Sequence, residues 1–130
     1  MIRARTALAA LAATAGACAA LLPVVGAQAG STVGRPQKKT VKIADDYYGP
    51  AKLTVNYGST ITWKWPTDVG DTHDVALKKG PTGAKKFQSE SFATGASYRQ
   101  KLTRPGVYRI YCTFHETEMT MTITVRKKPR

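Results

Sequence analysis

A short segment near the C-terminus contains three side chains that can bind a soft metal ion. The segment begins at Cys112, continues through His115 and ends at Met119. A second histidine, His73, lies about forty residues earlier. One thiol, two imidazoles and one thioether are together the donors of a mononuclear blue-copper electron-transfer site, with the thioether as the weak axial donor. These four residues therefore predict a site for one type 1 copper ion.

Other chemistry is open to the same thiol and imidazole. Cys112 and His115 have the spacing of half a zinc site, but the sequence has no second pair of Cys or His residues to complete a closed tetrahedron. A Cys–His nucleophile is conceivable, yet no Gly-rich oxyanion loop or nucleophile elbow accompanies it. Four protein donors around one ion also leave no open position for a substrate. We therefore do not expect an enzyme.

The thioether donor has competitors. Met121 lies two residues beyond Met119, and Glu116 and Glu118 offer oxygen atoms in the same segment. Met121 shares its strand phase with Ile123, which favours core packing, a common role for methionine. Loop carboxylates are usually exposed to solvent. Met119 is therefore the predicted axial ligand.

The elements that must position these donors are predicted to be strands. Alternating polar and apolar residues recur in short runs between turn signals, and no window shows a helical stripe. The predicted strands are 40–44, 52–57, 60–65, 73–78, 87–92, 97–103, 107–112 and 119–125. This spacing predicts an all-β fold, a Greek-key β-sandwich of seven to eight strands in two antiparallel sheets.

Strand phase brings the donors together. His73 opens its strand and Cys112 closes another, and each falls on the apolar face of its strand. Met119 opens the last strand in phase with the core residues. Inward-facing side chains at one end of a sandwich can converge, with loop 113–118 closing over them.

Residues 1–29 have the features of a signal peptide. Arg3 and Arg5 precede an apolar run, and a small-x-small cleavage pattern ends at Ala29. We expect an exported protein, secreted or held in the periplasm or cell envelope. Cys18 follows a box that resembles a lipoprotein cleavage site without its usual Leu, so lipid anchoring there is the weaker alternative.

The rest of the chain is predicted to be a flexible basic linker (30–39), one copper-binding domain (40–126) and a basic tail (127–130). Loss of the leader would leave 18 basic and 8 acidic residues, a net charge of +10. Basic runs of this kind are usually solvated tails. Their functional reading is steering to a transient acidic redox partner, or adsorption to an anionic membrane or envelope surface. The protein is expected to be a monomer. No recognition motif favours nucleic acid. Cys112 would be the single remaining cysteine, which excludes an internal disulfide.

The segment from about residue 40 to residue 125 resembles the cupredoxins, the small blue copper proteins related to plastocyanin, pseudoazurin and amicyanin. The resemblance is carried by Leu53-Thr-Val-x-x-Gly58-x-x-Ile-Thr-Trp63, His73-x-Val75, Phe87-x-Ser89, Pro105-Gly106-x-Tyr108-x-x-Tyr111-Cys112-x-x-His115 and Met119-x-x-x-Ile123-x-Val125. It implies copper held in a plane by His73, Cys112 and His115, with Met119 axial. It also implies one-electron transfer between protein partners, with the electron entering through His115 beside Phe114.

Two features depart from the family pattern. The family usually has Asn after the first ligand histidine, where this chain has Asp74. Asp74 is expected to accept a hydrogen bond from the Thr113 hydroxyl, and its charge is expected to lower the reduction potential. Three residues separate His115 from Met119, a spacing between those of amicyanin and plastocyanin.

Two functions from other classes remain as alternatives to electron transfer. A copper chaperone or sequestering protein would use Met119, Met121 and His115 to deliver Cu(I) without redox turnover. A metal-free adhesion domain would merely bury Cys112.

Overall fold

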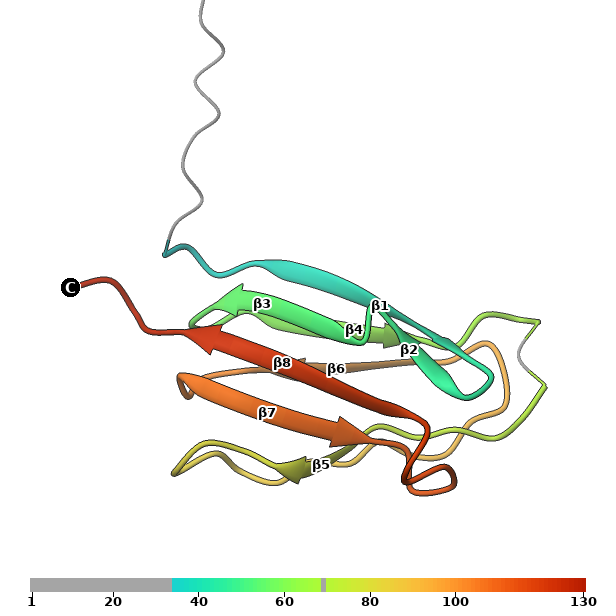
Figure 1. The fold of residues 1–130 in the computed structure, drawn as a ribbon. Helices are drawn as coiled ribbons and strands as arrows, with labels where there is room; N and C mark the ends of the chain where they lie inside the picture. Colours follow the sequence, from blue (N-terminus) through green and yellow to red (C-terminus); the bar gives the residue numbers. More distant parts are fainter. Residues whose placement is uncertain (1–33, 69) are drawn as a thin grey trace, which may run out of the picture. The chain divides into compact units, whose positions relative to one another are not determined.

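The computed structural model describes residues 34–68 and 70–130, so the predicted signal peptide and Cys18 lie outside the described residues. Eight strands form two layers (Figure 1). They are β1 (Lys38–Ala44), β2 (Tyr47–Gly49), β3 (Lys52–Asn56), β4 (Thr60–Lys64), β5 (Ala76–Lys79), β6 (Ser97–Lys101), β7 (Gly106–Tyr111) and β8 (Thr120–Arg126). Within this described part of the chain, no helix is long and apolar enough to cross a membrane. The predicted all-β sandwich is confirmed.

Each layer is a four-stranded sheet. The strand orders are β2-β1-β4-β6 and β3-β8-β7-β5. The prediction of purely antiparallel sheets was wrong, because β1 pairs with β4 in parallel and β3 pairs with β8 in parallel. These pairs join strands that are not hairpin neighbours, and strand alternation alone does not reveal the direction of such a pairing.

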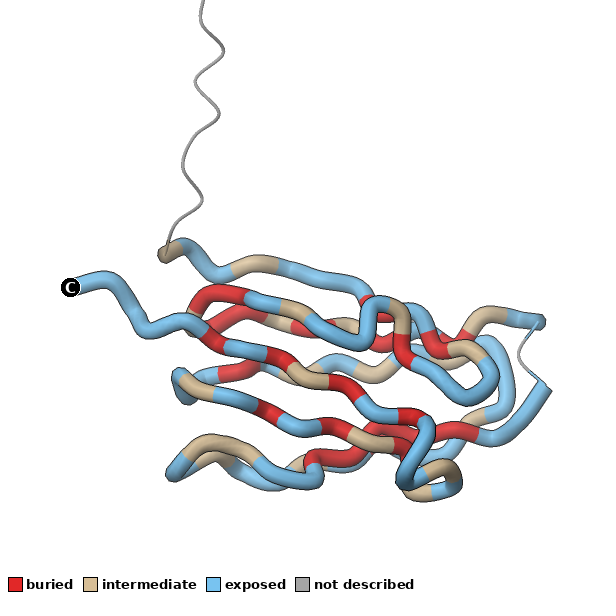
Figure 2. The backbone as a smooth tube through the Cα atoms, in the orientation of Figure 1, coloured by how far each residue is buried: buried red, intermediate tan, exposed pale blue. Residues whose placement is uncertain are grey.

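The core lies between the inner faces of the two sheets. Buried and exposed residues alternate along β7 and β8, as the tube in Figure 2 shows. Ile61 and Trp63 are fully buried, as their alternation predicted, and Trp65 is nearly so. Trp63 packs against the rings of Phe87 and Tyr98. This packing gives the sandwich a rigid centre on which its loops are mounted.

Some strand boundaries differ from the sequence prediction. β1 begins at Lys38, inside the predicted linker, and β2 was not predicted, because three residues are too few to show an alternating pattern. The regular part of β5 begins only at Ala76 and is disturbed by a bulge before Lys79. The predicted strand at 87–92 is reduced to isolated bridges with the chain at His73 and Ala76.

Candidate metal centre

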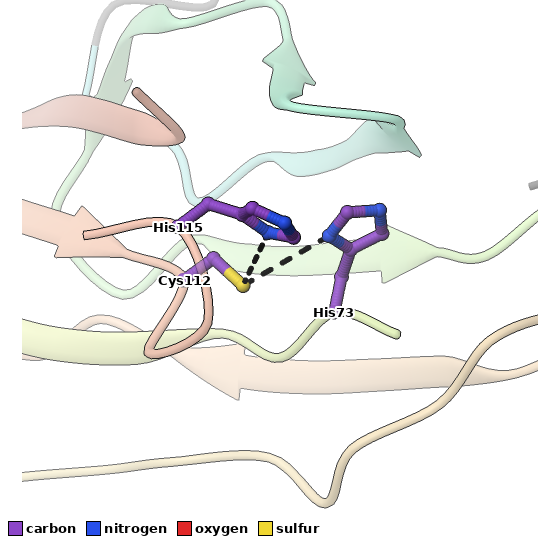
Figure 3. A group of neighbouring side chains, drawn as sticks. All are labelled: His73, Cys112 and His115. Atoms are coloured by element: carbon purple, nitrogen blue, oxygen red, sulfur yellow. Dashed lines mark hydrogen bonds between the residues drawn. The ribbon is translucent and has the colours of Figure 1, made fainter. Parts of the chain in front are cut away.

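Three metal-binding side chains meet at one end of the sandwich. The donor atoms of His73, Cys112 and His115 lie within 4.8 Å of one another. The Sγ atom of Cys112 is 3.9 Å from Nδ1 of His73 and 3.7 Å from Nδ1 of His115. Both imidazoles turn their Nδ1 edge toward the sulfur (Figure 3). The sequence placed these residues on separate strands and a loop, and the fold brings all three together.

The backbone around His73 is held from two sides. Its N–H and C=O both bond to Phe92, at 3.0 Å each. Its carbonyl oxygen also accepts a hydrogen bond of 3.2 Å from the indole N–H of Trp65. His73 is fully buried. The imidazole therefore cannot swing out of the cluster without disrupting the core.

The loop from Cys112 to Met119 is closed by its own backbone. The N–H of Cys112 donates to the carbonyl of Met119 at 3.0 Å, and the N–H of Met119 donates to the carbonyl of His115 at 2.9 Å. The N–H of His115 donates in turn to the carbonyl of Cys112 at 3.2 Å. Met119 is fully buried at the entry to β8. The three residues are thus fixed relative to one another by main-chain bonds.

Asp74 connects the histidine segment to the cysteine loop. Its carboxylate accepts the N–H and the hydroxyl of Thr113, at 2.7 Å each, and the side-chain amide of Gln88 at 2.9 Å. The expected bond from the Thr113 hydroxyl is therefore confirmed. Asp74 follows His73 directly, yet both are fully buried, because the regular strand has not yet begun at these residues. Tyr48 donates its hydroxyl to the carbonyl of Asp74 at 2.6 Å.

Two aspartates that the sequence did not single out contact the outer nitrogens of the histidines. Oδ1 of Asp45 lies 3.2 Å from Nε2 of His73, and Oδ1 of Asp46 lies 3.6 Å from Nε2 of His115. Both aspartates belong to the turn between β1 and β2. Paired acidic residues in a turn are common, and nothing in the sequence indicates that this turn reaches the imidazoles.

The residues in and around the cluster differ in burial, and burial shifts the pKa of two of them. Burial raises the pKa of the Cys112 thiol above its usual value. Burial also raises the pKa of Tyr48, with smaller contributions from Cys112 and Asp74, so its hydroxyl remains a hydrogen-bond donor. His115 keeps 23% of its side chain exposed, and the neighbouring Phe114 is 54% exposed. The cluster is thus enclosed except at the edge formed by these last two residues.

The chain is similar to known copper proteins. The plastocyanin/azurin family of copper-binding proteins matches residues 37–126. Among solved structures, a reduced mutant of amicyanin is 27% identical with a TM-score of 0.59, over 68% of this chain and 82% of that one. A pseudoazurin from Sinorhizobium is 22% identical with a TM-score of 0.57, over 71% and 76%. A purple cupredoxin from Nitrosopumilus maritimus is 24% identical with a TM-score of 0.54, over 67% and 98%.

No curated protein sequence matches the chain. The family match spans all eight strands and includes the three cluster residues and Met119. The donor set suits copper, since thiolate and thioether favour Cu(I) and imidazole also accepts Cu(II). The chain belongs to the plastocyanin/azurin family and is a cupredoxin with one type 1 copper site.

Proposed function

We propose that this cupredoxin carries single electrons between protein partners. In this proposal His73, Cys112, His115 and Met119 would hold one copper ion. The observation that carries it is the separation of the Cys112 sulfur from the two Nδ1 atoms, 3.9 Å and 3.7 Å. Metal–sulfur bonds of about 2.3 Å and metal–nitrogen bonds of about 2.0 Å, as in zinc sites, span up to about 4.3 Å between donors. One ion can therefore contact the sulfur together with either imidazole nitrogen, and all three donors lie within 4.8 Å of one another.

Bound copper supplies the one-electron couple, and the protein supplies a site that changes little between the two oxidation states. The buried His73, the closed loop from Cys112 to Met119 and the Asp74–Thr113 bonds hold the donors in place before the metal arrives. A geometry held in advance reduces the rearrangement that each electron transfer would otherwise require. The protein's role is thus to impose one compromise geometry.

The partially exposed His115 is the proposed route for the electron. Its imidazole reaches the surface beside the exposed ring of Phe114. A small apolar contact suits a partner that must dissociate quickly after transfer. The partner would therefore dock at the end of the sandwich that carries the copper site.

The charge of that end bears on the partner. All acidic residues of the chain lie in connections around the cluster, namely Asp45, Asp46, Asp68, Asp71, Asp74, Glu90, Glu116 and Glu118. The net charge alone predicts an acidic partner. An acidic partner would be attracted to the basic tail, which lies far from His115. We therefore propose that the partner group that docks at His115 is cationic. The basic end would instead contact an anionic envelope surface. Export by a leader of residues 1–29 remains part of the same proposal.

An optical titration of the metal-free protein with Cu(II) tests the function. We expect an intense visible thiolate-to-copper band that saturates at one equivalent and is bleached reversibly by a one-electron reductant. Cys112→Ser should abolish the band, because no thiolate remains. A colourless or faint complex of the wild-type protein, or a band that reduction destroys irreversibly, would refute the assignment.

A further inference from the structure

The turn between β1 and β2 brings one carboxylate to each imidazole of the cluster. Asp45 and Asp46 are consecutive, and their Oδ1 atoms lie 3.2 Å and 3.6 Å from Nε2 of His73 and His115 respectively. The two Nε2 atoms are the nitrogens that the cluster leaves free, since both Nδ1 atoms face the Cys112 sulfur. One turn therefore contacts both histidines on their outer side.

The carboxylate of Asp45 is held in place by further hydrogen bonds. The same Oδ1 atom accepts the N–H groups of Gly70 and Asp71 at 3.2 Å each, in the segment that leads to His73. These bonds, with that from His73, hold the pKa of Asp45 below its usual value. Asp45 is thus an anion oriented by two backbone donors and in contact with His73, although its side chain is 51% exposed.

The turn itself is held firmly against the cluster. Ala44 pairs with Tyr47 across the β1–β2 hairpin, so that Asp45 and Asp46 form a two-residue turn. Asp46 has a φ of +66°, a left-handed conformation that Asp tolerates better than most residues. The buried Tyr48 then anchors β2 through its bond to the Asp74 carbonyl. The carboxylates are therefore positioned by the hairpin rather than by free rotation of surface side chains.

Metal-bound histidines commonly donate their second N–H to a carboxylate, which selects the tautomer and increases the basicity of the ligand. Resting on the proposed function, we propose that Asp45 and Asp46 are positioning residues for the copper. Asp45 keeps the His73 proton on Nε2 and so leaves Nδ1 free to bind, and both aspartates stabilise Cu(II) relative to Cu(I) by adding negative charge behind the ligands.

The two aspartates should not contribute equally. Asp45 contacts a fully buried imidazole at the shorter distance, whereas Asp46 contacts one that is 23% exposed at 3.6 Å. Solvent screens the second pair more strongly. We therefore expect Asp45 to control both the tautomer and the potential, and Asp46 to have a smaller effect on the potential alone.

The experiment compares Asp45→Asn and Asp46→Asn with Glu118→Gln, which removes one charge from the β7–β8 loop as a matched control. Removal of an outer hydrogen-bond partner typically weakens metal binding by about 10-fold to 100-fold. We expect at least the lower value for Cu(II) binding in Asp45→Asn. A tenfold loss for Cu(II) with Cu(I) unchanged raises the reduction potential by about 59 mV. Asp46→Asn should raise it less, and Glu118→Gln least.

A second readout needs no copper. Long-range proton–nitrogen correlation spectra of the metal-free protein report which imidazole nitrogen carries the proton. We expect His73 to be protonated on Nε2 in the wild-type protein and in Glu118→Gln, and to become a mixture of tautomers in Asp45→Asn. Thermal unfolding of each variant verifies that the fold is retained, and Asp45→Glu serves as a second variant if Asp45→Asn does not fold.

The outcomes separate this inference from the proposed function. A missing visible band in the copper-loaded wild-type protein overturns the function. The wild-type protein could show a normal visible band while both Asp variants have the same reduction potential and the same His73 tautomer as Glu118→Gln. That result would overturn the proposed role of Asp45 and Asp46 and leave the proposed function intact. A rise in potential that follows the order Asp45→Asn, Asp46→Asn, Glu118→Gln supports it.

Discussion

The two ends of the sandwich differ in the side-chain hydrogen bonds that hold their connections. At the metal end, side-chain hydrogen bonds link residues far apart in sequence, as between Asp74 and Thr113 or between Tyr48 and Asp74. At the opposite end, where β3 ends, the side-chain bonds are made by neutral groups, some between distant residues, as from Asn56 to Gln37 and Arg35, and some within one turn. Tyr108, for example, bonds through its hydroxyl to both backbone groups of Arg104, four residues away.

Charge divides the molecule in the same way. The carboxylates gather in the connections of the metal end, whereas the tail and the turns of the opposite end carry Lys85, Lys86, Arg104 and the run from Arg126 to Arg130. Holding a thiol and two imidazoles within reach of one ion requires bonds between elements, and those bonds bring acidic side chains with them.

The largest effect is expected on stability, when Asp74 at the metal end is compared with Tyr108 at the opposite end. Asp74→Ala removes the acceptor of two donors on the half-buried Thr113 and of one on the exposed Gln88. Because hydrogen bonds to charged groups contribute about 1.5–3 kcal/mol each, we expect the free energy of unfolding of the metal-free protein to fall by about 3–5 kcal/mol. Tyr108→Phe removes only two neutral local bonds and should cost about 1–2 kcal/mol.

Urea unfolding of both variants measures the difference, and wild-type protein under the same conditions is the reference. Equal losses, or a larger loss in Tyr108→Phe, would contradict the view that the metal end depends on its long-range bonds. Copper-loaded Asp74→Ala should in addition show a weaker visible band, because Thr113 follows the ligand Cys112 directly.

Much of this architecture was predictable. Alternation placed Ile61 and Trp63 inward, and the phase of the runs around His73 and Cys112 placed both donors at one end of the core. These features depend on a two-residue period that can be read from the sequence alone.

What could not be predicted depends on contacts between distant segments. The three residues of β2 are too few to show a period, and the parallel pairings of β1 with β4 and β3 with β8 are set by the tertiary fold. The reach of Asp45 and Asp46 to the two histidines depends on that same unpredicted hairpin. The innermost ligands could therefore be found from the sequence, while the residues behind them could not.

Copper binding at the metal end should release a proton, because burial raises the pKa of the Cys112 thiol. The metal-free protein then keeps this proton at neutral pH, and copper must displace it. Copper affinity should rise about tenfold per pH unit, and should continue to rise above the ordinary thiol pKa of about 8.5. Competition with a chelator of known affinity at several pH values measures this slope.

Stability of the metal-free protein should change in the opposite direction. Above about pH 8.5 the thiol ionises in the unfolded chain but not yet in the folded one, so ionisation favours the unfolded state. The free energy of unfolding should therefore fall as the pH rises through this range. Cys112→Ser should remove this thiol-dependent fall. A wild-type copper affinity that is flat above about pH 8 would show that the thiol is already ionised without metal.

The division of charge predicts a difference between small redox reagents. At low ionic strength, the reduced protein should react faster with a cationic oxidant than its net positive charge alone would allow, because carboxylates surround the exposed edge of His115. The double variant Glu116→Gln and Glu118→Gln should lower the rate with the cation by about threefold to tenfold. Lys127→Gln with Lys128→Gln is the matched control at the other end and should change the rate by less than about twofold. Equal effects of the two pairs, measured by stopped-flow absorbance, would mean that transfer does not occur at the acidic end.

The smallest effect is expected for Met121, the first core residue of β8 beyond the predicted ligand Met119. Met121 lies opposite Ile110 in the β7–β8 pairing and is nearly fully buried, two residues beyond Met119. As a core residue, Met121→Leu should cost less than about 1.5 kcal/mol in stability and leave the copper affinity and reduction potential unchanged. Met119→Leu is the matched variant and should shift the potential while the thiolate band persists. A protein that delivers Cu(I) through paired thioethers would instead lose Cu(I) affinity in both variants. Comparable losses would therefore favour copper delivery over electron transfer. They would also mean that the metal site includes Met121 of β8.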